Sequence, residues 1–285
     1  MLTPLPDILL RPLVENALRE DLGHAGDITT DAIIEENAQN RAALNARKNG
    51  VVAGLDCARL AFQILDPDAV FTAMKNDGDT VKNGDCLARI EGKARALLTA
   101  ERTALNFLSH LSGIATETQK FVEAVKPHKA RISCTRKTNP GLRVIEKYAV
   151  RAGGGSNHRF GLDDAVLIKD NHIAMVQGIR PALEKVRQSV GHLVKVEIEV
   201  DTLSQLDEVI ALLPEFPVDA VLLDNMPIPM LKQAVEKVNG RFVTEASGGV
   251  TLQNVAAIAA TGVDIISVGG ITHSAPILDV GLDAG

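Results

Sequence analysis

The segment Val194–Asn225, VKVEIEVDTLSQLDEVIALLPEFPVDAVLLDN, contains one complete unit of a repeat that extends over more than half of the chain. Val194–Val200 and Ala220–Leu223 are short apolar runs, typical of strands that are buried on both faces. Between them, Leu203–Leu213 has the apolar spacing of an amphipathic helix. A strand, a helix and a second buried strand in this order predict a parallel β/α unit.

The same rhythm runs from residue 130 to the C-terminal region. The strand candidates are Arg131–Cys134, Ala165–Ile168, Val194–Val200, Ala220–Leu223, Phe242–Glu245 and Ile265–Val268. The helices that alternate with them are Leu142–Arg151, Ile179–Val190, Leu203–Leu213, Pro229–Val238 and Leu252–Ala260. Six strands are fewer than the eight of a complete α/β barrel. We therefore predict an incomplete parallel α/β barrel.

Polar side chains follow these strands at the point where each strand ends. In strand order they are Lys137, then Lys169-Asp170-Asn171-His172, Glu199 with Asp201, Asp224-Asn225, Ser247-Gly248-Gly249, and Gly269-Gly270. The carboxyl ends of parallel strands meet at one mouth of a barrel, where barrel enzymes carry their chemistry. Because all these polar residues directly follow strands, the sequence predicts a single site at the carboxyl rim.

The third strand carries acids at alternate positions. Glu197, Glu199 and Asp201 are two residues apart and are expected to point the same way. Buried acids are costly unless cations or a metal ion compensate them. Pairing with nearby lysines would be a purely structural role, but a position at the rim favours a site role for Glu199 and for Asp224.

The two glycine pairs come after consecutive final strands, and each is expected to open a helix. A glycine after a strand often serves only a tight turn. Two such pairs, Gly248-Gly249 and Gly269-Gly270, nevertheless match the way in which barrel folds bind phosphate with backbone N–H groups.

Lysine and arginine gather between Arg131 and Arg159, although the formal net charge of the chain is −6. This stretch has seven Lys/Arg and one acid, Glu146, and it includes the turn-forming Asn139-Pro140-Gly141 and Gly153-Gly154-Gly155. A basic helix face would not carry proline and a glycine triplet. We therefore expect loops that bring guanidinium, ammonium and imidazole groups to a concave pocket for a strongly anionic small molecule.

Composition excludes several classes of function. With 285 residues, 46% of them hydrophobic, the chain has enough apolar material for one large α/β domain and a smaller one. The net negative charge argues against a general nucleic-acid binder, and no apolar run approaches the roughly 18 residues of a membrane span. Cys57, Cys86 and Cys134 lack C-x-x-C spacing, and His158 has no second ligand at zinc spacing. We expect a cytoplasmic protein with neither nucleic-acid nor membrane partners.

Several catalytic motifs are missing from the sequence. There is no G-x-x-x-x-G-K-[ST], no G-x-S-x-G and no H-E-x-x-H, and His158 occupies the last glycine place of a potential G-x-G-x-x-G. Nucleoside-triphosphate, serine-hydrolase and zinc-protease functions therefore lose support.

The N-terminal part has a different pattern. Leu9–Leu22 has helical spacing, and Asp27–Asp31 is expected to be a polar turn or cap. Short strand-like runs broken by Asn-Gly and Asp-Gly turns predict an antiparallel sheet; they are Ala42–Ala46, Val51–Leu55, Val70–Met74 and Cys86–Ile90, with a helix near Cys57–Leu65. Ala94–Val125 comes next as a long helical stretch, and we expect a break at Ser112-Gly113.

In this order, the motifs resemble those of the quinolinate phosphoribosyltransferase family over nearly the whole chain. The matching segments are Glu101-Arg102, Leu111–Thr116, Thr135–Thr138, Glu146–Ala149, Gly153–Arg159, Leu167–His172, Glu197–Asp201, Leu222–Asn225, Glu245–Val250 and Ser267–Gly270. As a set they are highly specific. At Ser156 many family members carry His, and we assign no role to that position.

The resemblance implies an architecture and an assembly. An N-terminal α/β sandwich-like domain would span residues 1–112, with the tail 272–285 returning to it, and an incomplete α/β barrel would span 113–271. Family members are dimers or larger homo-oligomers in which the N-terminal domain of one subunit covers the barrel mouth of another. Arg102 would then reach the site of the neighbouring subunit.

The resemblance also implies a reaction, in which quinolinate and phosphoribosyl pyrophosphate give nicotinate mononucleotide, pyrophosphate and carbon dioxide. The quinolinate pocket would comprise Arg102, Arg136, His158, Arg159 and Lys169, and the 5′-phosphate cradle Ser247, Gly248, Gly249, Gly269 and Gly270. Lys137 and Lys169 match positions that stabilise the departing pyrophosphate. Glu199 and Asp224 match carboxylates near the ribose and its Mg²⁺, which keeps most of its water shell. These four residues are the expected catalytic groups.

Three other functions stay open at this point. A phosphoribosyltransferase acting on nicotinate, or a relative from a molybdenum-transport operon, would share the architecture, although the Lys169–His172 motif and the set of cations favour a dicarboxylate. A barrel aldolase would use Lys169 as a Schiff-base nucleophile. A binding protein would keep the pocket without turnover, which the joint presence of Glu199, Asp224 and Lys137 disfavours.

Overall fold

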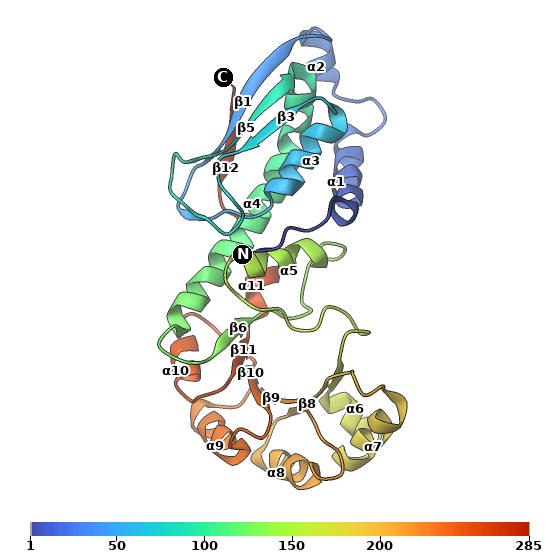
Figure 1. Cartoon of the computed structure of the whole chain (residues 1–285), viewed down its shortest axis with the longest axis vertical. Helices are drawn as coiled ribbons and strands as arrows, with labels where there is room; N and C mark the ends of the chain where they lie inside the picture. Colours follow the sequence, from blue (N-terminus) through green and yellow to red (C-terminus); the bar gives the residue numbers. More distant parts are fainter. Residues whose placement is uncertain (1, 285) are drawn as a thin grey trace. The chain divides into compact units, whose positions relative to one another are not determined.

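The computed structural model describes residues 2–284, and the chain divides into two compact units. Unit 1 contains Met1–Gln119, Thr138–Gly154 and Gly270–Gly285, and unit 2 contains Lys120–Lys137 and Gly155–Gly269. Each unit is built around its own sheet (Figure 1). Among the described residues, no helix is both long and apolar enough to cross a lipid bilayer.

Unit 1 contains the predicted antiparallel sheet. Its strand order is β12 (Val280–Ala284), β1 (Gln39–Ala46), β5 (Cys86–Lys93) and β3 (Val70–Ala73), and β2 (Gly50–Val51) pairs separately with β4 (Thr80–Val81). The helices α1 (Asp7–Leu22), α2 (Ile28–Ile33) and α3 (Leu55–Leu65) belong to the same unit. Buried side chains alternate along β1, so one face of the sheet packs into the core.

Aspartates cap two helices of unit 1. The turn or cap expected at Asp27–Asp31 is confirmed as a cap, because Asp27 is the N-cap of α2 and its carboxylate accepts from Thr30 N at 2.9 Å. The expected strand Val51–Leu55 ends at Val51, because the Asp77 carboxylate accepts from the N–H groups of Gly54 and Leu55 and fixes the start of α3.

The long helix α4 (Ala94–Val125) is continuous, so the expected break at Ser112-Gly113 was wrong. Ser112 Oγ accepts from Ala53 N at 2.9 Å and is fully buried. Gly113 allows a close approach, since a Cβ there would overlap the Pro276 carbonyl and lie 2.9 Å from Ile277 Cα. A glycine that permits packing is compatible with an unbroken helix.

Unit 2 contains the predicted parallel sheet, in the order β6 (Arg131–Ser133), β11 (Ile265–Ser267), β10 (Val243–Ser247), β9 (Ala220–Asp224), β8 (Val196–Val200) and β7 (Val166–Ile168). All the strands predicted after residue 130 are confirmed. The helices of this unit after β7 are α6 (Asp170–Met175), α7 (Ile179–Ser189), α8 (Leu203–Leu212), α9 (Ile228–Val238) and α10 (Val255–Ala259), on the outer side of the sheet (Figure 1). Because β6 and β7 are the two edges, the barrel is open, as predicted.

Two helices from the C-terminal half of the sequence group with unit 1. They are α5 (Arg143–Ala152) and α11 (Gly270–His273). Glu146 of α5 is fully buried, and it accepts hydrogen bonds from Asn139 N at 3.1 Å and Asn139 Nδ2 at 2.7 Å. Glu146 thereby anchors the loop immediately after Arg136 and Lys137.

Candidate active site

The carboxyl ends of the strands in unit 2 carry most of the predicted site residues. Lys169 follows β7 directly, Glu199 lies near the end of β8, and Asp224 and Ser247 are the last residues of β9 and β10. Ser247 and Asp224 are paired in the register of β10 with β9. The parallel sheet therefore brings together residues that are far apart in the sequence.

Lys169 and Glu199 form an ion pair at the rim. Lys169 Nζ lies 3.0 Å from Glu199 Oε2, with the glutamate buried and the lysine side chain half exposed. Burial raises the pKa of Glu199, and the hydrogen bond and charge of Lys169 act in the opposite direction. The pair combines a buried acid with a cation that still reaches solvent.

Asp201 and Asp224 complete an acidic group with Glu199. One carboxylate oxygen from each of the three lies within 4.8 Å of the others. Burial, and then the charges of Asp224 and Asp170, raises the pKa of Asp201. Sequence reasoning ranked Asp201 below Glu199 and Asp224, but the alternation along β8 was the signal that predicted their common face. Carboxylate oxygens at this spacing suit a hard divalent cation such as Mg²⁺.

A strained turn holds Asp224 beside Ser247. Asn225 adopts φ 51°, and its Nδ2 donates to Asp224 Oδ2 at 2.5 Å, while its backbone N–H donates to Ser247 O at 2.9 Å. Gly248 has φ +93°, and a Cβ there would lie 2.6 Å from Asn225 Cγ. Only glycine fits at this position, for both reasons.

The two glycine pairs lead into different local structures. The expectation that Gly248-Gly249 opens a helix was wrong, because both residues have positive φ and α10 begins only at Val255. Asn254 Nδ2 donates to Gly249 O at 2.9 Å and closes the intervening loop. After β11, Gly269 is followed by α11, which does begin at Gly270.

Two arginines of the basic stretch, Arg136 and Arg159, lie close together in unit 2. Arg136 and Lys137 follow β6, and the charge of Arg136 adds to burial in lowering the pKa of Arg159. Arg159 Nη1 donates to Ala165 O at 2.9 Å. Arg159 Nε is buried and donates to no atom within residues 2–284. A buried guanidinium N–H without a protein acceptor is suited to an anionic ligand.

Ser156 sets the path of this segment. Its backbone forms a parallel bridge with Ser133 of β6, and its hydroxyl donates to Ile132 O at 2.9 Å. The short pairing extends the sheet at the edge of β6 and fixes the residues just before His158 and Arg159.

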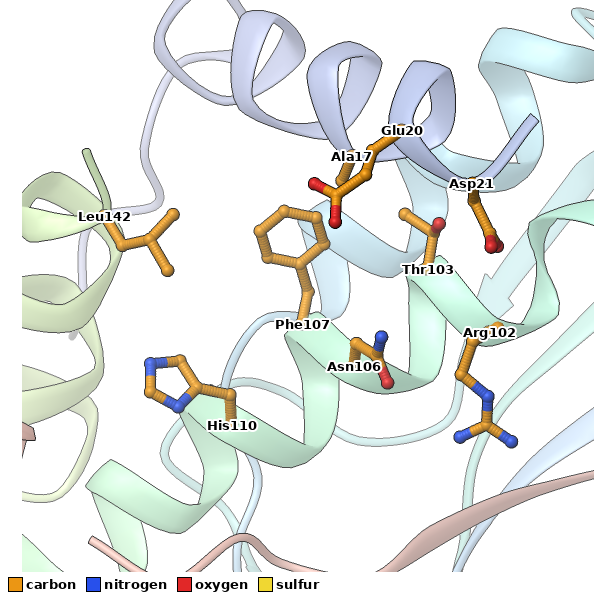
Figure 2. Close-up of a pocket in the computed structure, with 9 residues that line it drawn as sticks. All are labelled: Ala17, Glu20, Asp21, Arg102, Thr103, Asn106, Phe107, His110 and Leu142. Atoms are coloured by element: carbon orange, nitrogen blue, oxygen red, sulfur yellow. The ribbon is translucent and has the colours of Figure 1, made fainter. Parts of the chain in front are cut away.

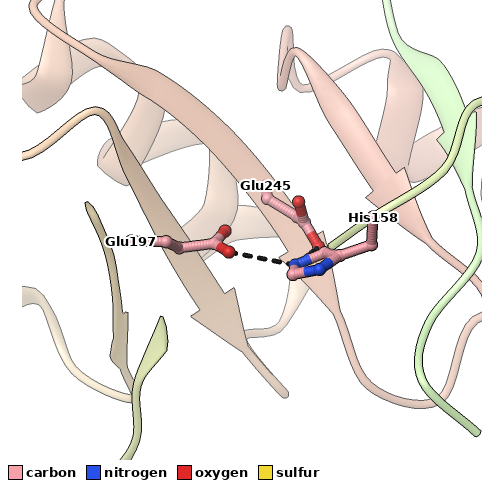
Figure 3. A group of neighbouring side chains, drawn as sticks. All are labelled: His158, Glu197 and Glu245. Atoms are coloured by element: carbon pink, nitrogen blue, oxygen red, sulfur yellow. Dashed lines mark hydrogen bonds and ion pairs between the residues drawn. The ribbon is translucent and has the colours of Figure 1, made fainter. Parts of the chain in front are cut away.

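His158 faces the interior of unit 2 (Figure 3). Its Nε2 lies 3.0 Å from Glu197 Oε2 and 3.5 Å from Glu245 Oε1. Its Nδ1 accepts from Arg159 N at 2.7 Å. Sequence reasoning ranked Glu197 low and gave Glu245 no role; charged residues in otherwise apolar strands were the available signal.

Arg102 lies in unit 1, on α4, whereas all the other predicted site residues except Gly270 belong to unit 2. It lines a hollow of about 340 Å³ between α1 and α4 (Figure 2). The other lining residues are Ala17, Glu20, Asp21, Thr103, Asn106, Phe107, His110 and Leu142. His110 is part of a further contact, since its Nε2 lies 2.9 Å from the buried Glu146.

Sequence comparison matches both parts of the chain to one family. The model of the quinolinate phosphoribosyl transferase N-terminal domain matches residues 27–112, and that of the C-terminal domain matches residues 114–283. The nicotinate-nucleotide pyrophosphorylase [carboxylating] of Mycobacterium leprae is 45% identical over 96% of each protein. A probable enzyme of the same name from Bacillus subtilis is 42% identical over 96% of this chain and 93% of the relative.

Solved structures give the same result. The nicotinate-nucleotide pyrophosphorylase of Ehrlichia chaffeensis superimposes with a TM-score of 0.90 at 43% identity, covering 96% of this chain and 98% of that one. NadC from Streptococcus pyogenes superimposes with a TM-score of 0.92 at 39% identity, covering 98% of both chains. With both domain models matched in order and relatives this similar over nearly their whole length, the chain belongs to the quinolinate phosphoribosyltransferase family.

Proposed function

We propose that the chain transfers the phosphoribosyl group of phosphoribosyl pyrophosphate to quinolinate with decarboxylation, giving nicotinate mononucleotide, pyrophosphate and carbon dioxide. The observation that carries this proposal is the arrangement at the carboxyl rim, where the buried Glu199, grouped with Asp201 and Asp224, stands beside the cation of Lys169. Both substrates are multiply anionic, and the transferred ribose becomes cationic during the reaction. The rim offers charges of both signs to meet these demands.

Quinolinate would be bound by the cationic side of the site. Planar guanidinium groups suit adjacent carboxylates, and Arg136 and Arg159 lie close enough for the charge of one to lower the pKa of the other. The buried Nε of Arg159 has no acceptor within the described residues, so a substrate carboxylate would satisfy it. Lys169, with His158 next to Arg159, completes this part of the proposed pocket.

The part of the site around Glu199 and Asp224 would promote ribosyl transfer. Glu199 and Asp224 favour positive charge at the ribose carbon as the pyrophosphate leaves, and Lys137 and Lys169 stabilise the charge that develops on the leaving group. Ser247 with Gly248, Gly249, Gly269 and Gly270 would hold the 5′-phosphate through backbone and hydroxyl donors. The positive φ of Gly248 and Gly249 supports this role, since it lets the backbone turn around a ligand.

Magnesium fits the same acidic group. Glu199 and Asp224, joined by Asp201, would hold it through water or carboxylate oxygen, and it would supply neutralising charge for the leaving pyrophosphate. After ribosyl transfer, the positive pyridine nitrogen accommodates the electron pair left at the adjacent carbon when carbon dioxide departs. The remaining task of the protein is to hold the mononucleotide and exclude water.

The direct test is a product assay. Purified protein, with Mg²⁺ and phosphoribosyl pyrophosphate, is incubated with quinolinate labelled in its 2-carboxylate, or with nicotinate. We expect labelled carbon dioxide and nicotinate mononucleotide from quinolinate, and no mononucleotide from nicotinate. Turnover of nicotinate would assign the chain to a different phosphoribosyltransferase activity. Borohydride trapping of a carbonyl substrate on Lys169 would instead support an aldolase.

Assembly forms a second part of the proposal. The functional form would be a homodimer or a larger homo-oligomer in the cytoplasm, with Arg102 contributed to the site of the neighbouring subunit. The position of Arg102 in the unit that lacks Lys169, Glu199 and Asp224 is consistent with this.

A mixing experiment tests the contribution of Arg102 in trans. Arg102→Ala and Lys169→Ala proteins are each expected to be inactive, and co-refolding them should restore activity, because a mixed dimer contains one site with neither substitution. Co-refolding each variant with itself is the control. If mixed dimers form but neither the mixture nor the controls regain activity, Arg102 belongs to the site of its own subunit.

A further inference from the structure

A chain of polar side chains crosses the interior of unit 2 and ends at Arg159; Figure 3 shows its central members, His158, Glu197 and Glu245. The Ser267 hydroxyl donates to Glu245 Oε1, and ligand atoms of Glu245, Glu197 and His158 lie within 4.8 Å of one another. Glu197 Oε2 lies 3.0 Å from His158 Nε2, and the Arg159 backbone N–H donates to the other ring nitrogen at 2.7 Å. The strands β8, β10 and β11 are thereby joined to a predicted ligand of quinolinate.

The contacts define where the protons lie. Because Nδ1 of His158 accepts from Arg159, Nε2 carries the ring proton and donates it to Glu197. Glu197 Oε1 is buried and, with both acids ionised, would accept no hydrogen bond from residues 2–284. A proton on Glu245 supplies the missing donor. A proton on Glu245 therefore completes this chain of polar contacts.

Electrostatics agree with this geometry. Burial, followed by the charge of Glu197, raises the pKa of Glu245 to about 7, against the lowering effects of His158 and Ser267. The groups that face Glu245 are Glu197 of β8, Ser267 of β11 and His158, which directly precedes Arg159.

Arg159 depends on these contacts for its place. Its guanidinium is held by one hydrogen bond to Ala165 O, and its Nε has no acceptor within the described residues. The charge of Arg136 acts against the Arg159 cation, whereas the charges of Glu197 and Asp164 favour it. The hydrogen bond from the Arg159 backbone to His158 fixes the start of this side chain.

We propose that Glu197 and Glu245 are positioning residues that act through His158 to hold Arg159 ready for a carboxylate of quinolinate. This inference rests on the proposed function. Since the chain acts through Arg159, it governs the KM for quinolinate and leaves kcat and the KM for phosphoribosyl pyrophosphate unchanged.

The test uses steady-state kinetics between pH 6 and pH 8.5. For the wild type, the KM for quinolinate is expected to rise as Glu245 loses its proton at a pH of about 7. Glu245→Gln keeps a donor toward Glu197 and cannot ionise, so its KM should stay constant over this range. Glu197→Gln removes a charge that helps to hold the proton on Glu245, so the rise should move to lower pH. His158→Phe deletes the acceptor of Arg159 N and should raise the KM on the order of tenfold at every pH.

Asp219→Asn is the matched control. The Asp219 carboxylate accepts from Val196 N at 2.8 Å, at the start of β8 and so at the end of the strand opposite to the site. This variant should leave the KM profile unchanged. A wild type that forms no mononucleotide from quinolinate would refute the proposed function itself. An active wild type whose KM profile is shared by Glu245→Gln and Glu197→Gln would overturn the positioning role alone.

A measurement on the unaltered protein covers the case in which a variant does not fold. Nitrogen-15 NMR of labelled histidines, with the His158 signals assigned by their loss in His158→Phe or by through-bond correlation, reports the ring tautomer. We expect the ring proton on Nε2 and none on Nδ1. A ring protonated on Nδ1 would overturn the proposal.

Discussion

Lys169 and Glu199 illustrate how individual residues acquire their function from strand ends. Each was predicted from its place at the carboxyl end of a buried strand, and the parallel pairing of β7 with β8 brings them to 3.0 Å. The sequence could not show that Lys169 would pair with Glu199, because this depends on strand order. For Glu245 it offered only a charged residue in an otherwise apolar strand, because the importance of this residue comes from Glu197 and His158 in space.

Replacement of Lys169 should affect catalysis and not stability. Lys169→Met is expected to lower kcat/KM on the order of 10²–10³-fold, the usual effect of losing one stabiliser of a developing anion. The thermal midpoint should change little, because Lys169 is half exposed and the buried Glu199, whose pKa is already raised by burial, can take up a proton when the lysine is absent. Lys195→Met, which breaks the ion pair with Asp219 before the start of β9, is the control and should keep full activity. A large fall in the thermal midpoint of the Lys169 variant would make this residue structural.

Glu245 should make stability depend on pH. Its pKa is about 7 in the folded protein against an ordinary value of 4.5, so between these limits the folded state retains a proton that the unfolded state has lost. Stability from this group is full below about 4.5 and declines as the pH rises through about 7. Denaturant titrations at several pH values should show this decline in the wild type and a smaller one in Glu245→Gln. Equal declines in the two proteins would contradict the assignment.

At the scale of elements, the repeat of buried strands and amphipathic helices was sufficient to predict the parallel sheet. The six strands of unit 2 lie where the apolar runs were found. The strand expected at Val51–Leu55 ends early because Asp77, which is distant in sequence, caps α3, and a propensity pattern does not reveal such a cap. The predicted break in α4 failed because Gly113 serves contact with Pro276 and not chain bending.

The close approach at Gly113 leads to a stability prediction. Gly113→Ala should destabilise the protein by about 1–3 kcal/mol, because the added methyl overlaps backbone atoms that cannot move independently. Gly191→Ala is the control, since a Cβ there meets nothing within 4 Å. Urea denaturation of the two variants measures the difference. A Gly113→Ala protein as stable as the wild type would show that the tail around Pro276 can give way.

At the scale of the whole molecule, a negative chain concentrates cations at one site. The net charge is −6, yet Arg136, Lys137, Arg159 and Lys169 all belong to unit 2 and to the loops that follow its strands or precede β7. Such local charge attracts anionic substrates against the overall field. The predicted boundary at residues 112/113 and the trans role of Arg102 remain predictions at this scale.

Salt should therefore weaken substrate binding. Raising the ionic strength from about 0.05 M to about 0.5 M shortens the Debye length to a few ångströms and should increase the KM for both substrates several-fold, with a smaller change in kcat. Steady-state rates in NaCl, repeated with potassium glutamate to separate screening from specific chloride binding, measure this. A KM independent of salt would show that the cations are compensated before substrate arrives.

The sequence alone determined the fold class, the open barrel and the rim on which the site residues gather, because buried strands and strand ends leave periodic patterns in the chain. The folded structure decided which residues meet. Strand order, register and packing produce the Lys169–Glu199 pair, the acidic group that Asp201 and Asp224 form with Glu199, and the buried chain from Ser267 to Arg159. These are contacts between residues that are distant in sequence, and local patterns cannot specify them.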